Sequence, residues 1–276
     1  MKDFRDKVAV VTGAASGIGR ALAEHCARER MKVVLADVEV AALRKAAEEL
    51  TAQGAVVLSQ QTDVSKRTEV ELLAQRTLET FGAVHMLFNN AGVVGGPSIW
   101  ESTWEDWEWV IGVNLWGVIH GVKVFTPIML AQDADCHITN TASVAGLVTT
   151  NPFGGYVVTK HAVVALTEHL YRSLAQRSAK VGASVLCPGF VNTRIMDWER
   201  NRPPSLKSPS TIVSAEHQAD IQRYRESMAT AMPPLELAEH VFAAIRERRF
   251  YILTHPEHTS RIQTRMESIV QGRNPE

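Results

Sequence analysis

The segment YVVTK places Tyr156 and Lys160 four residues apart, and this pair carries the strongest chemical signal in the chain. Side chains at i and i+4 share one face of a helix, so a phenol and an ammonium would lie close together. A free tyrosine has a pKa near ~10, and a neighbouring ammonium favours the phenolate and lowers that pKa. The pair is therefore a candidate for general acid–base chemistry in which Tyr156 takes or gives a proton.

Two further polar residues are candidates for the same site. Ser143, in TAS, lies thirteen residues before Tyr156 and can hydrogen-bond a substrate oxygen close to the phenol. Asn114 lies in the segment VNLWG. Each residue also has a structural explanation: Ser143 as a turn residue, Asn114 as a helix cap or kink, and Tyr156 as a core aromatic with a satisfied hydroxyl.

A glycine-rich segment, TGAASGIG, follows the apolar run VAVV and precedes an amphipathic helical pattern. Gly13, Gly17 and Gly19 permit a tight turn and let backbone N–H groups approach a pyrophosphate at the helix N-terminus. Ser16 and Ile18 lie in the same loop. The alternative is a tight turn that binds no ligand.

Asp37 ends the second predicted strand, where a carboxylate can accept hydrogen bonds from both hydroxyls of an adenosine ribose. The same charge would repel a 2′-phosphate. Because Val38 follows it, and because the glycine-rich loop contains no Lys or Arg, NAD is favoured over NADP. Asp37 can also cap the helix predicted to begin near Val40, and the two roles are compatible.

Six motifs together resemble the short-chain dehydrogenase/reductase family in order and spacing: TGAASGIG, NNAG, Asn114 in VNLWG, Ser143 in TAS, YVVTK and PGFVNT. The likeness is detailed from about residue 7 to 193 and continues beyond in the rhythm of elements. It implies an oxidoreductase in which Tyr156 exchanges the hydroxyl proton while a hydride passes between a substrate carbon and NAD. It also implies that Lys160 binds the nicotinamide ribose and that Asn114 holds a water linking Lys160 to solvent.

The resemblance implies a set of cofactor-binding residues as well. Asp63 is expected beside the adenine ring, NNAG beneath the adenine ribose, and Val191 with Thr193 as a clamp on the carboxamide and pyrophosphate. The expected set is Gly13, Ser16, Gly17, Ile18, Gly19, Asp37, Asp63, Val64, Asn90, Ala91, Gly92, Tyr156, Lys160, Pro188, Gly189, Val191 and Thr193.

Strand and helix patterns alternate along the chain and would position these motifs. Short apolar runs, typical of parallel strands buried on both faces, predict strands at 8–11, 33–36, 56–59, 86–89, 137–141, 184–186 and 250–254. Helical patterns cover 19–30, 40–53, 66–81, 104–132, 156–177 and 236–248. This alternation predicts an α/β fold, a doubly wound (Rossmann) three-layer sandwich with a seven-stranded parallel sheet and right-handed crossovers. The motif loops then meet at the carboxyl ends of the strands.

Cofactor and catalytic motifs interleave along this sheet, so residues 1–276 are expected to form a single domain. From 192 to 234 the pattern dissolves into polar residues and prolines around a helical piece at 216–228. A long loop of this kind is usually functional, and we interpret it as a substrate-binding flap. Residues 255–276 form a tail, in which 256–272 is expected to pack as a helix against the domain or a partner.

Composition excludes several classes of protein. With 29 Lys+Arg against 30 Asp+Glu there is no basic excess for nucleic acid or anionic lipid, and 45% hydrophobic residues argue against disorder. Cys26, Cys136 and Cys187 are too scattered for a disulfide framework and are expected to be buried, reduced thiols.

No targeting or metal signal stands out. The longest apolar stretch, residues 110–122, is interrupted by Asn114 and His120 and is too short to span a membrane, so a cytoplasmic location is expected. His255 and His258, in THPEH, lack an acidic third ligand, and no metal is expected because the cofactor carries the hydride.

The substrate is indicated only by class. The positions expected beside it are mostly apolar or aromatic, which favours a hydrophobic secondary alcohol or ketone. They are Val93, Val94, Val144, Phe153, Phe190 and Trp198.

Assembly is expected from the resemblance. The tryptophan-rich segment WESTWEDWEWVIGVNLWG is interpreted as helix packing, with some rings at a subunit interface. The family pairs through the helices at 104–132 and 156–177, so a homodimer or homotetramer is expected, and the tail favours a dimer.

Three competing functions remain open from the sequence. One is an NADP-dependent carbonyl reductase that tolerates Asp37. An epimerase or dehydratase would share YxxxK but usually carries TGxxGxxG. A redox-silent nucleotide-binding scaffold would normally have lost a catalytic residue, whereas Asn114, Ser143, Tyr156 and Lys160 are all present.

Overall fold

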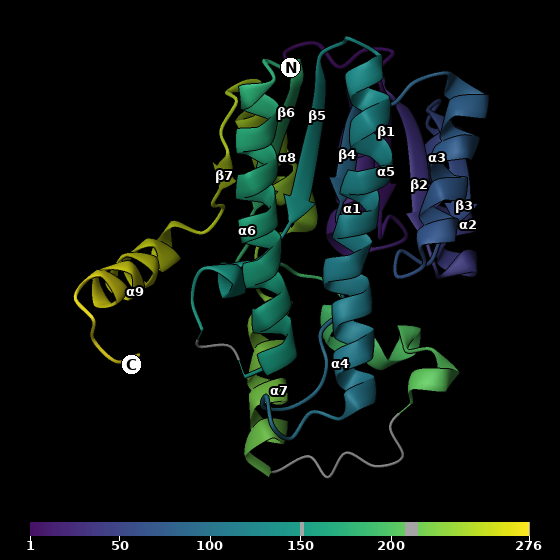
Figure 1. Ribbon diagram of the computed structural model, residues 1–276. Coiled ribbons are helices and arrows are strands. Elements are labelled where there is room, and N and C mark those ends of the chain that lie inside the picture. The colour runs from purple at the N-terminus through teal and green to yellow at the C-terminus, as the bar shows by residue number, and fades with distance from the viewer. Residues whose placement is uncertain (150–151, 208–214, 276) are drawn as a thin grey trace.

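The computed structural model describes residues 1–149, 152–207 and 215–275. Its centre is a seven-stranded, all-parallel sheet with strand order β3-β2-β1-β4-β5-β6-β7 (Figure 1). The order reverses after β3, so the sheet is doubly wound with its switch point between β1 and β4. The strands are β1 (Val8–Thr12), β2 (Lys32–Asp37), β3 (Val56–Gln61), β4 (Met86–Asn89), β5 (Cys136–Thr141), β6 (Val181–Leu186) and β7 (Tyr251–Ile252).

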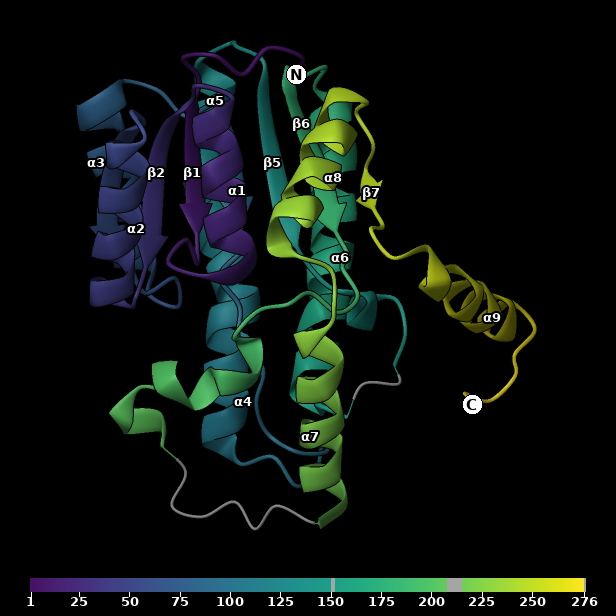
Figure 2. The ribbon, with the colours of Figure 1, turned by 180° about the vertical axis from the view of Figure 1, so that it is seen from behind.

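Helices cover both faces of the sheet (Figures 1 and 2). The first face holds α1 (Gly17–Arg28), α2 (Val40–Ala52) and α8 (Pro234–Arg246), and the second holds α3 (Arg67–Phe81), α5 (Gly117–Ala131) and α6 (Gly154–Gln176). Two apolar cores result, one on each side of β1, because alternate residues of that strand point to opposite faces: Ala9 and Val11 to one, Val8 and Val10 to the other. The expected α/β three-layer sandwich is confirmed.

The edge strand β3 departs from the sequence prediction. Residues 56–59 were expected to be buried on both faces, but β3 has no fully buried residue and Val56 is 55% exposed. β3 is paired on one side alone, to β2, and the other side faces solvent. Apolar runs at an edge and in the centre of a sheet look alike in sequence, because β-branched residues favour both. The other predicted strands and helices are present, with ends shifted by up to three residues.

The long helix predicted at 104–132 contains an irregular turn. It runs as α4 (Trp104–Ile111), a π-helical turn η1 (Gly112–Trp116) and α5, and Asn114 is buried inside that turn. Among the described residues, Trp104–Ala131 is the one helix long and apolar enough, by length and composition, to cross a membrane, with a mean hydropathy of 1.3. It packs on the sheet through Val118, Phe125 and Met129, as a core helix does.

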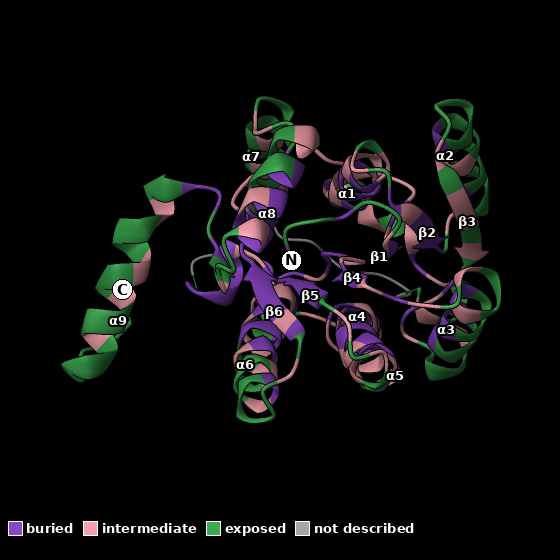
Figure 3. Cartoon of the chain, turned by 90° about the horizontal axis from the view of Figure 1, so that it is seen from above, coloured by how far each residue is buried: buried purple, intermediate pink, exposed green. Residues whose placement is uncertain are grey.

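The flap and the tail differ in how they meet the sheet. In the flap, η3 (Ile195–Asn201), η4 (Pro204–Leu206) and α7 (Ala215–Ala229) lie beyond the carboxyl ends of the strands, beside α4 (Figure 2). In the tail, η5 (Pro256–His258) leads into α9 (Thr259–Val270), the expected helix. α9 has no buried residue and projects away from the sheet past β7 (Figures 1 and 3). The tail was expected to pack against the domain or against a partner, and along most of α9 it does not pack against its own domain.

Candidate active site

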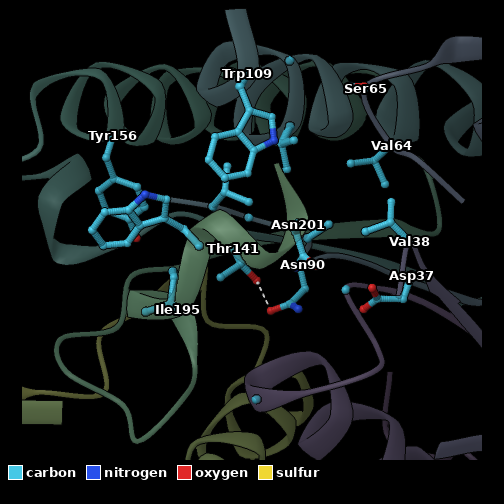
Figure 4. Close-up of a pocket in the computed structure, with 18 of the residues that line it drawn as sticks. Asp37, Val38, Val64, Ser65, Asn90, Trp109, Thr141, Tyr156, Ile195 and Asn201 are labelled. Atoms are coloured by element: carbon cyan, nitrogen blue, oxygen red, sulfur yellow. Dashed lines mark hydrogen bonds between the residues drawn. The ribbon is translucent and has the colours of Figure 1, made fainter. Parts of the chain in front are cut away.

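The motif loops meet at the carboxyl ends of the parallel strands, where they line a cavity of about 860 Å³. Figure 4 shows Asp37, Asn90, Thr141 and Tyr156 around this space, with Trp109 on the opposite side. Every residue of the expected cofactor set lines the cavity except Gly19. We call this space the strand-end cavity.

The glycine-rich loop leaves the start of α1 open to a ligand. Gly13 and Gly17 adopt φ of +66° and +55°, which side-chain-bearing residues rarely adopt. A Cβ on Gly19 would lie 2.0 Å from the Gly13 carbonyl oxygen, so Gly19 closes the turn and does not face the cavity. Ser16 makes no side-chain cap, and the first turn of α1 carries no acid. An anion can therefore meet the uncapped N–H groups and the positive end of the helix dipole.

Asp37 lies at the end of β2 with both carboxylate oxygens facing backbone donors. Oδ2 accepts from the Ala15 N–H at 2.9 Å, and Oδ1 accepts from the Glu39 N–H at 3.0 Å. Burial raises the pKa of Asp37, while these N–H groups act in the opposite direction. Each oxygen retains further acceptor capacity, which suits a ribose diol. The sequence also allowed Asp37 to cap α2. The Asp37 side chain accepts from Glu39, the residue before α2, but from no N–H group of α2 itself, so it does not cap that helix directly.

A hydrogen-bonded group holds NNAG against β1. The Thr12 hydroxyl accepts from the N–H groups of Asn90 (2.9 Å) and Ala91 (3.1 Å). The Asn90 amide donates to the Thr12 carbonyl at 3.1 Å and accepts from the Thr141 hydroxyl at 3.3 Å (Figure 4). This network fixes the floor of the strand-end cavity through three neighbouring strands.

Tyr156 and Lys160 lie on one face of α6, as their spacing predicts. The Lys160 ammonium is 5.4 Å from the centre of the Tyr156 ring and donates to the Thr141 carbonyl at 2.8 Å. Burial is the dominant influence on both groups: it raises the pKa of Tyr156 to about 12 and lowers the pKa of Lys160 to about 8. The expectation that the ammonium lowers the pKa of Tyr156 is therefore wrong for the protein alone, because desolvation outweighs it; hydrogen bonding to Ser143 is the opposing influence.

Asn114 does not line the cavity but supports its wall. Its side chain accepts from the Val93 N–H at 2.8 Å and donates to the Val93 carbonyl at 2.9 Å and to the Thr159 hydroxyl at 3.2 Å. A Cβ on Gly92 would lie 3.5 Å from both Asn114 Oδ1 and Lys160 Nζ, so the amide and the ammonium flank this glycine. Of its sequence alternatives, the kink fits the π-helical turn.

Ser143 follows β5 and begins a short 3-10 turn. Its hydroxyl accepts from the Ala145 N–H at 3.1 Å and approaches the Pro188 carbonyl at 3.4 Å. The turn-residue alternative therefore also holds, although the side chain still lines the cavity.

A second, smaller cavity of about 110 Å³ adjoins the first. We call it the apolar cavity. Four expected substrate positions, Val94, Val144, Phe153 and Phe190, line it, whereas Trp198 and Val93 line the strand-end cavity. Ser143 and Tyr156 line both. The catalytic candidates thus stand where the two spaces meet.

The structure adds residues that the sequence did not single out for the site. Trp107 and Trp109 line the strand-end cavity, although tryptophans of this segment were expected to pack; Trp109 does both, at 3% exposed. Trp100 and Trp104 are 85% and 86% exposed, so packing within the chain is wrong for these two rings. The sequence signal that could have placed Trp107 and Trp109 at the site is that they lie in the same predicted helix, 104–132, as Asn114.

Flap residues reach the cavity through two ion pairs. Arg200 and Asn201 both bind Glu39 Oε1, at 2.9 and 3.0 Å, beside Asp37. Arg202 is buried, binds Asp106 Oδ1 at 2.6 Å and lies 4.5 Å over the Trp109 ring. Such long-range contacts leave no local pattern in a polar, proline-rich segment.

The strand-end cavity fits a dinucleotide. Three features of a dinucleotide site line this one cavity. They are glycines with no room for a Cβ, an uncapped helix N-terminus and a carboxylate at the end of β2. Among the described residues, no group of three or more His, Cys, Asp or Glu side chains could hold a metal ion. The three cysteines are buried and unbonded to one another.

Three kinds of comparison agree on the family. The sequence profile described as short chain dehydrogenase matches residues 7–203. The crystal structure of a short-chain dehydrogenase/reductase from Burkholderia phymatum in complex with NAD superposes with a TM-score of 0.97 at 48% identity, covering 100% of this chain and 98% of that one.

Two characterised relatives extend the comparison. A CLA biosynthesis dehydrogenase/reductase of Lactiplantibacillus plantarum is 36% identical over 100% of this chain and 97% of its own length. A cyclohexanol dehydrogenase of Acinetobacter sp. strain SE19 is 34% identical over 70% of this chain and 76% of its own length. With the sheet, the motif loops and these matches in agreement, the chain belongs to the short-chain dehydrogenase/reductase family and is an oxidoreductase.

Proposed function

We propose that the protein uses NAD(H) to interconvert an apolar secondary alcohol and its ketone. One observation carries this proposal: Ser143 and Tyr156 line both the strand-end cavity and the apolar cavity. A hydroxyl-bearing carbon placed at that junction faces a dinucleotide on one side and an apolar pocket on the other. The cyclohexanol dehydrogenase relative supports an alicyclic or similarly apolar alcohol.

In this proposal the chain's side chains move the proton and orient the substrate. Ser143 holds the substrate oxygen beside Tyr156, and Tyr156 removes its proton during oxidation or returns it during reduction. A bound nicotinamide ring supplies the carbon that accepts or returns the hydride. Each oxidation therefore removes one hydride from the substrate carbon and transfers one proton to the Tyr156 phenolate, which passes that proton to solvent before the next turnover; reduction runs in reverse.

Lys160 and Asn114 have supporting roles. Lys160 is a buried ammonium whose remaining N–H groups can bind a nicotinamide ribose, and its positive charge stabilises a phenolate at Tyr156. Because burial alone raises the pKa of Tyr156 to about 12, the tyrosine needs further positive charge at the junction to act near neutral pH. Asn114, whose side chain is fixed by Val93 and Thr159, holds in this proposal the water that links Lys160 to solvent.

The preference for NAD rests on the carboxylates at the adenosine end. Asp37 and Glu39 both line the strand-end cavity there, and a 2′-phosphate would add negative charge beside them. Arg200 also lines the cavity at this end, but its guanidinium is bonded to Glu39 at 2.9 Å. The NAD-bound Burkholderia structure supports the same choice.

The remaining expectations about the whole protein belong to this proposal. We propose that residues 1–276 form one domain, with residues 192–234 as its substrate flap and 255–276 as its tail. Exposed apolar side chains on the long helices, Trp104, Trp116 and Val158, support a homo-oligomer through α4–α5 and α6. A cytoplasmic location is proposed from the sequence.

An alcohol-oxidation screen tests the function. Purified protein is given NAD or NADP with a panel of secondary alcohols, and reduced cofactor is followed by absorbance at mildly alkaline pH. We expect turnover of cyclic and long-chain alcohols with NAD and at least about tenfold lower kcat/KM with NADP. Activity confined to sugars or polyols would contradict the proposed substrate class, and a preference for NADP would contradict the assignment of Asp37.

A further inference from the structure

The segment THPEH joins the last strand to the tail, and it is anchored to the loop that follows β6. His255 is buried and uses both ring nitrogens: Nδ1 accepts from the Gly189 N–H at 3.0 Å, and Nε2 lies 2.8 Å from the Phe190 carbonyl. A carbonyl only accepts, so Nε2 carries the proton and the ring is the neutral tautomer. The Thr254 hydroxyl completes the set at 2.8 Å from Nδ1. The start of the tail is therefore fixed against Gly189 and Phe190.

This anchor brings the next turn of the chain to the apolar cavity. His258 and Arg261 line that cavity together with Ser143 and Tyr156. The approach is close, because a Cβ on Gly189 would lie 2.8 Å from His258 Nε2. The first turn of α9 thus belongs to the site, although the rest of α9 projects into solvent.

The cavity lining is one-sided in charge. Among the described residues that line it, Arg261 is the one permanent cation and none is Asp or Glu. The Arg261 charge is felt inside, since it lowers the pKa of Tyr224, a lining phenol, against the stronger effect of burial. Two acids lie in the surroundings: Asp220 acts on Tyr224 and Glu257 acts on His258, but neither lines the cavity.

We infer that the substrate carries an anionic group, a carboxylate by preference, which Arg261 binds while the apolar part fills the cavity. This inference rests on the proposed function. A guanidinium binds a carboxylate through two parallel N–H donors, and His258 offers a further polar contact beside it. The reacting hydroxyl lies at Ser143 and Tyr156, so the alcohol carbon and the carboxylate are separated by the apolar lining. The protein thus selects hydroxy or keto acids with an apolar spacer.

A spacer series with matched charge tests this assignment. The substrates are secondary hydroxy acids from 5-hydroxyhexanoate to 11-hydroxydodecanoate, each paired with its methyl ester, and kcat/KM with NAD is measured for both members. We expect the acid to exceed its ester by about tenfold or more at the best spacer length, the effect of one charge-assisted contact. In Arg261→Gln that ratio should fall to about one, because the acid loses its charge-assisted contact.

Arg265→Gln is the matched control, because Arg265 lies one turn further along α9 and does not line the cavity. It should keep the wild-type ratio, and thermal melting checks that both variants remain folded. Esters that are oxidised without any acid preference, or a preference that persists in Arg261→Gln, would overturn the carboxylate assignment and leave the proposed function intact. If neither acids nor esters are oxidised at any length while the alcohol screen gives turnover, the carboxylate assignment fails alone; if that screen also gives none, both proposals fail.

Discussion

The strand-end cavity, where we propose that the cofactor binds, and the apolar cavity, where we propose that the substrate binds, are built from different kinds of atoms; we call them the cofactor side and the substrate side. The cofactor side is mainly backbone: glycines at positive φ, an uncapped helix N-terminus and the ends of β1, β2 and β4. The substrate side is mainly side chains, and the flap and the tail bring in several of them, such as Met196, Tyr224 and Arg261. The first uses short-range geometry that a motif can encode, whereas the second depends on contacts between distant segments.

Ser143 and Tyr156 lie at the boundary between the two sides. Because both residues line both cavities, a substitution in either cavity can alter the geometry of the same reacting atoms. Substitutions on the cofactor side should therefore change the dissociation constant for NADH. Substitutions on the substrate side should change the KM for the substrate. The following experiments use that difference, in order of decreasing effect.

Tyr156→Phe at the boundary should have the largest effect. It removes the group that exchanges the proton, so kcat should fall by roughly 10²–10⁴ while NADH binding changes little. Steady-state rates and NADH fluorescence titration measure the two effects. Tyr171→Phe, on the exposed face of the same helix, is the control and should keep wild-type rates. Wild-type turnover by Tyr156→Phe would refute the mechanism.

Breaking the buried ion pair should loosen the substrate side. Asp106 and Arg202 are 3% and 4% exposed, and Asp106 also caps α4 by accepting from the Thr103 N–H. Asp106→Asn removes the buried counter-ion of Arg202 and leaves only the exposed carboxylate of Glu199, which should cost up to about 3–5 kcal/mol. Urea unfolding, and proteolysis of the flap with and without NADH, would measure it. Arg202→Met combined with Asp106→Asn should recover part of this loss, and a purely additive double variant would show that the pair is not coupled.

Gly19→Ala should damage the cofactor side instead. The new Cβ would lie 2.0 Å from the Gly13 carbonyl oxygen, so the loop must shift, at a cost of about 1–3 kcal/mol. We expect weaker NADH binding with little change in the acid-to-ester preference. Gly155→Ala is the control, because its Cβ would meet atoms no nearer than 3.8 Å. Unchanged NADH affinity in Gly19→Ala would show that the loop does not contact the cofactor.

Lys160 should give the protein a pH-dependent stability. Its pKa is about 8 in the folded chain and 10.5 when exposed, so between these values the unfolded chain binds more protons and stability rises with pH. Between pH 8 and 9.5 the free energy of unfolding of the wild type should therefore rise by about 1.6 kcal/mol more than that of Lys160→Met. Urea titrations at several pH values would show it, and parallel pH profiles would mean that the ammonium is not desolvated.

Releasing the flap from Glu39 should have the smallest effect. Glu39 is partly exposed and binds Arg200 and Asn201, and ion pairs of this kind contribute about 1 kcal/mol or less. Glu39→Gln should therefore change substrate KM by no more than a few fold, with the difference shrinking at high salt. A large loss of kcat would mean that this contact affects more than substrate binding.

The sequence determined the parts of the protein that depend on local geometry. The strand–helix alternation gave the seven-stranded sheet and the motif loops at its edge, because both follow from periodicity and from residues with special backbone freedom. It failed for the burial of β3, since edge and central strands share residue preferences, and it did not say which tryptophans pack and which face solvent, since a helical wheel does not distinguish these faces.

Tertiary structure alone decided the rest. The junction of two cavities at Tyr156, the buried pair of Arg202 with Asp106 and the approach of Arg261 to the apolar cavity all join residues from separate parts of the chain. The pKa of Tyr156 was also decided by the tertiary structure. The YVVTK spacing suggested that Lys160 lowers this pKa, but burial by the surrounding elements raises it. Desolvation depends on everything that encloses a group, and no local pattern encodes it.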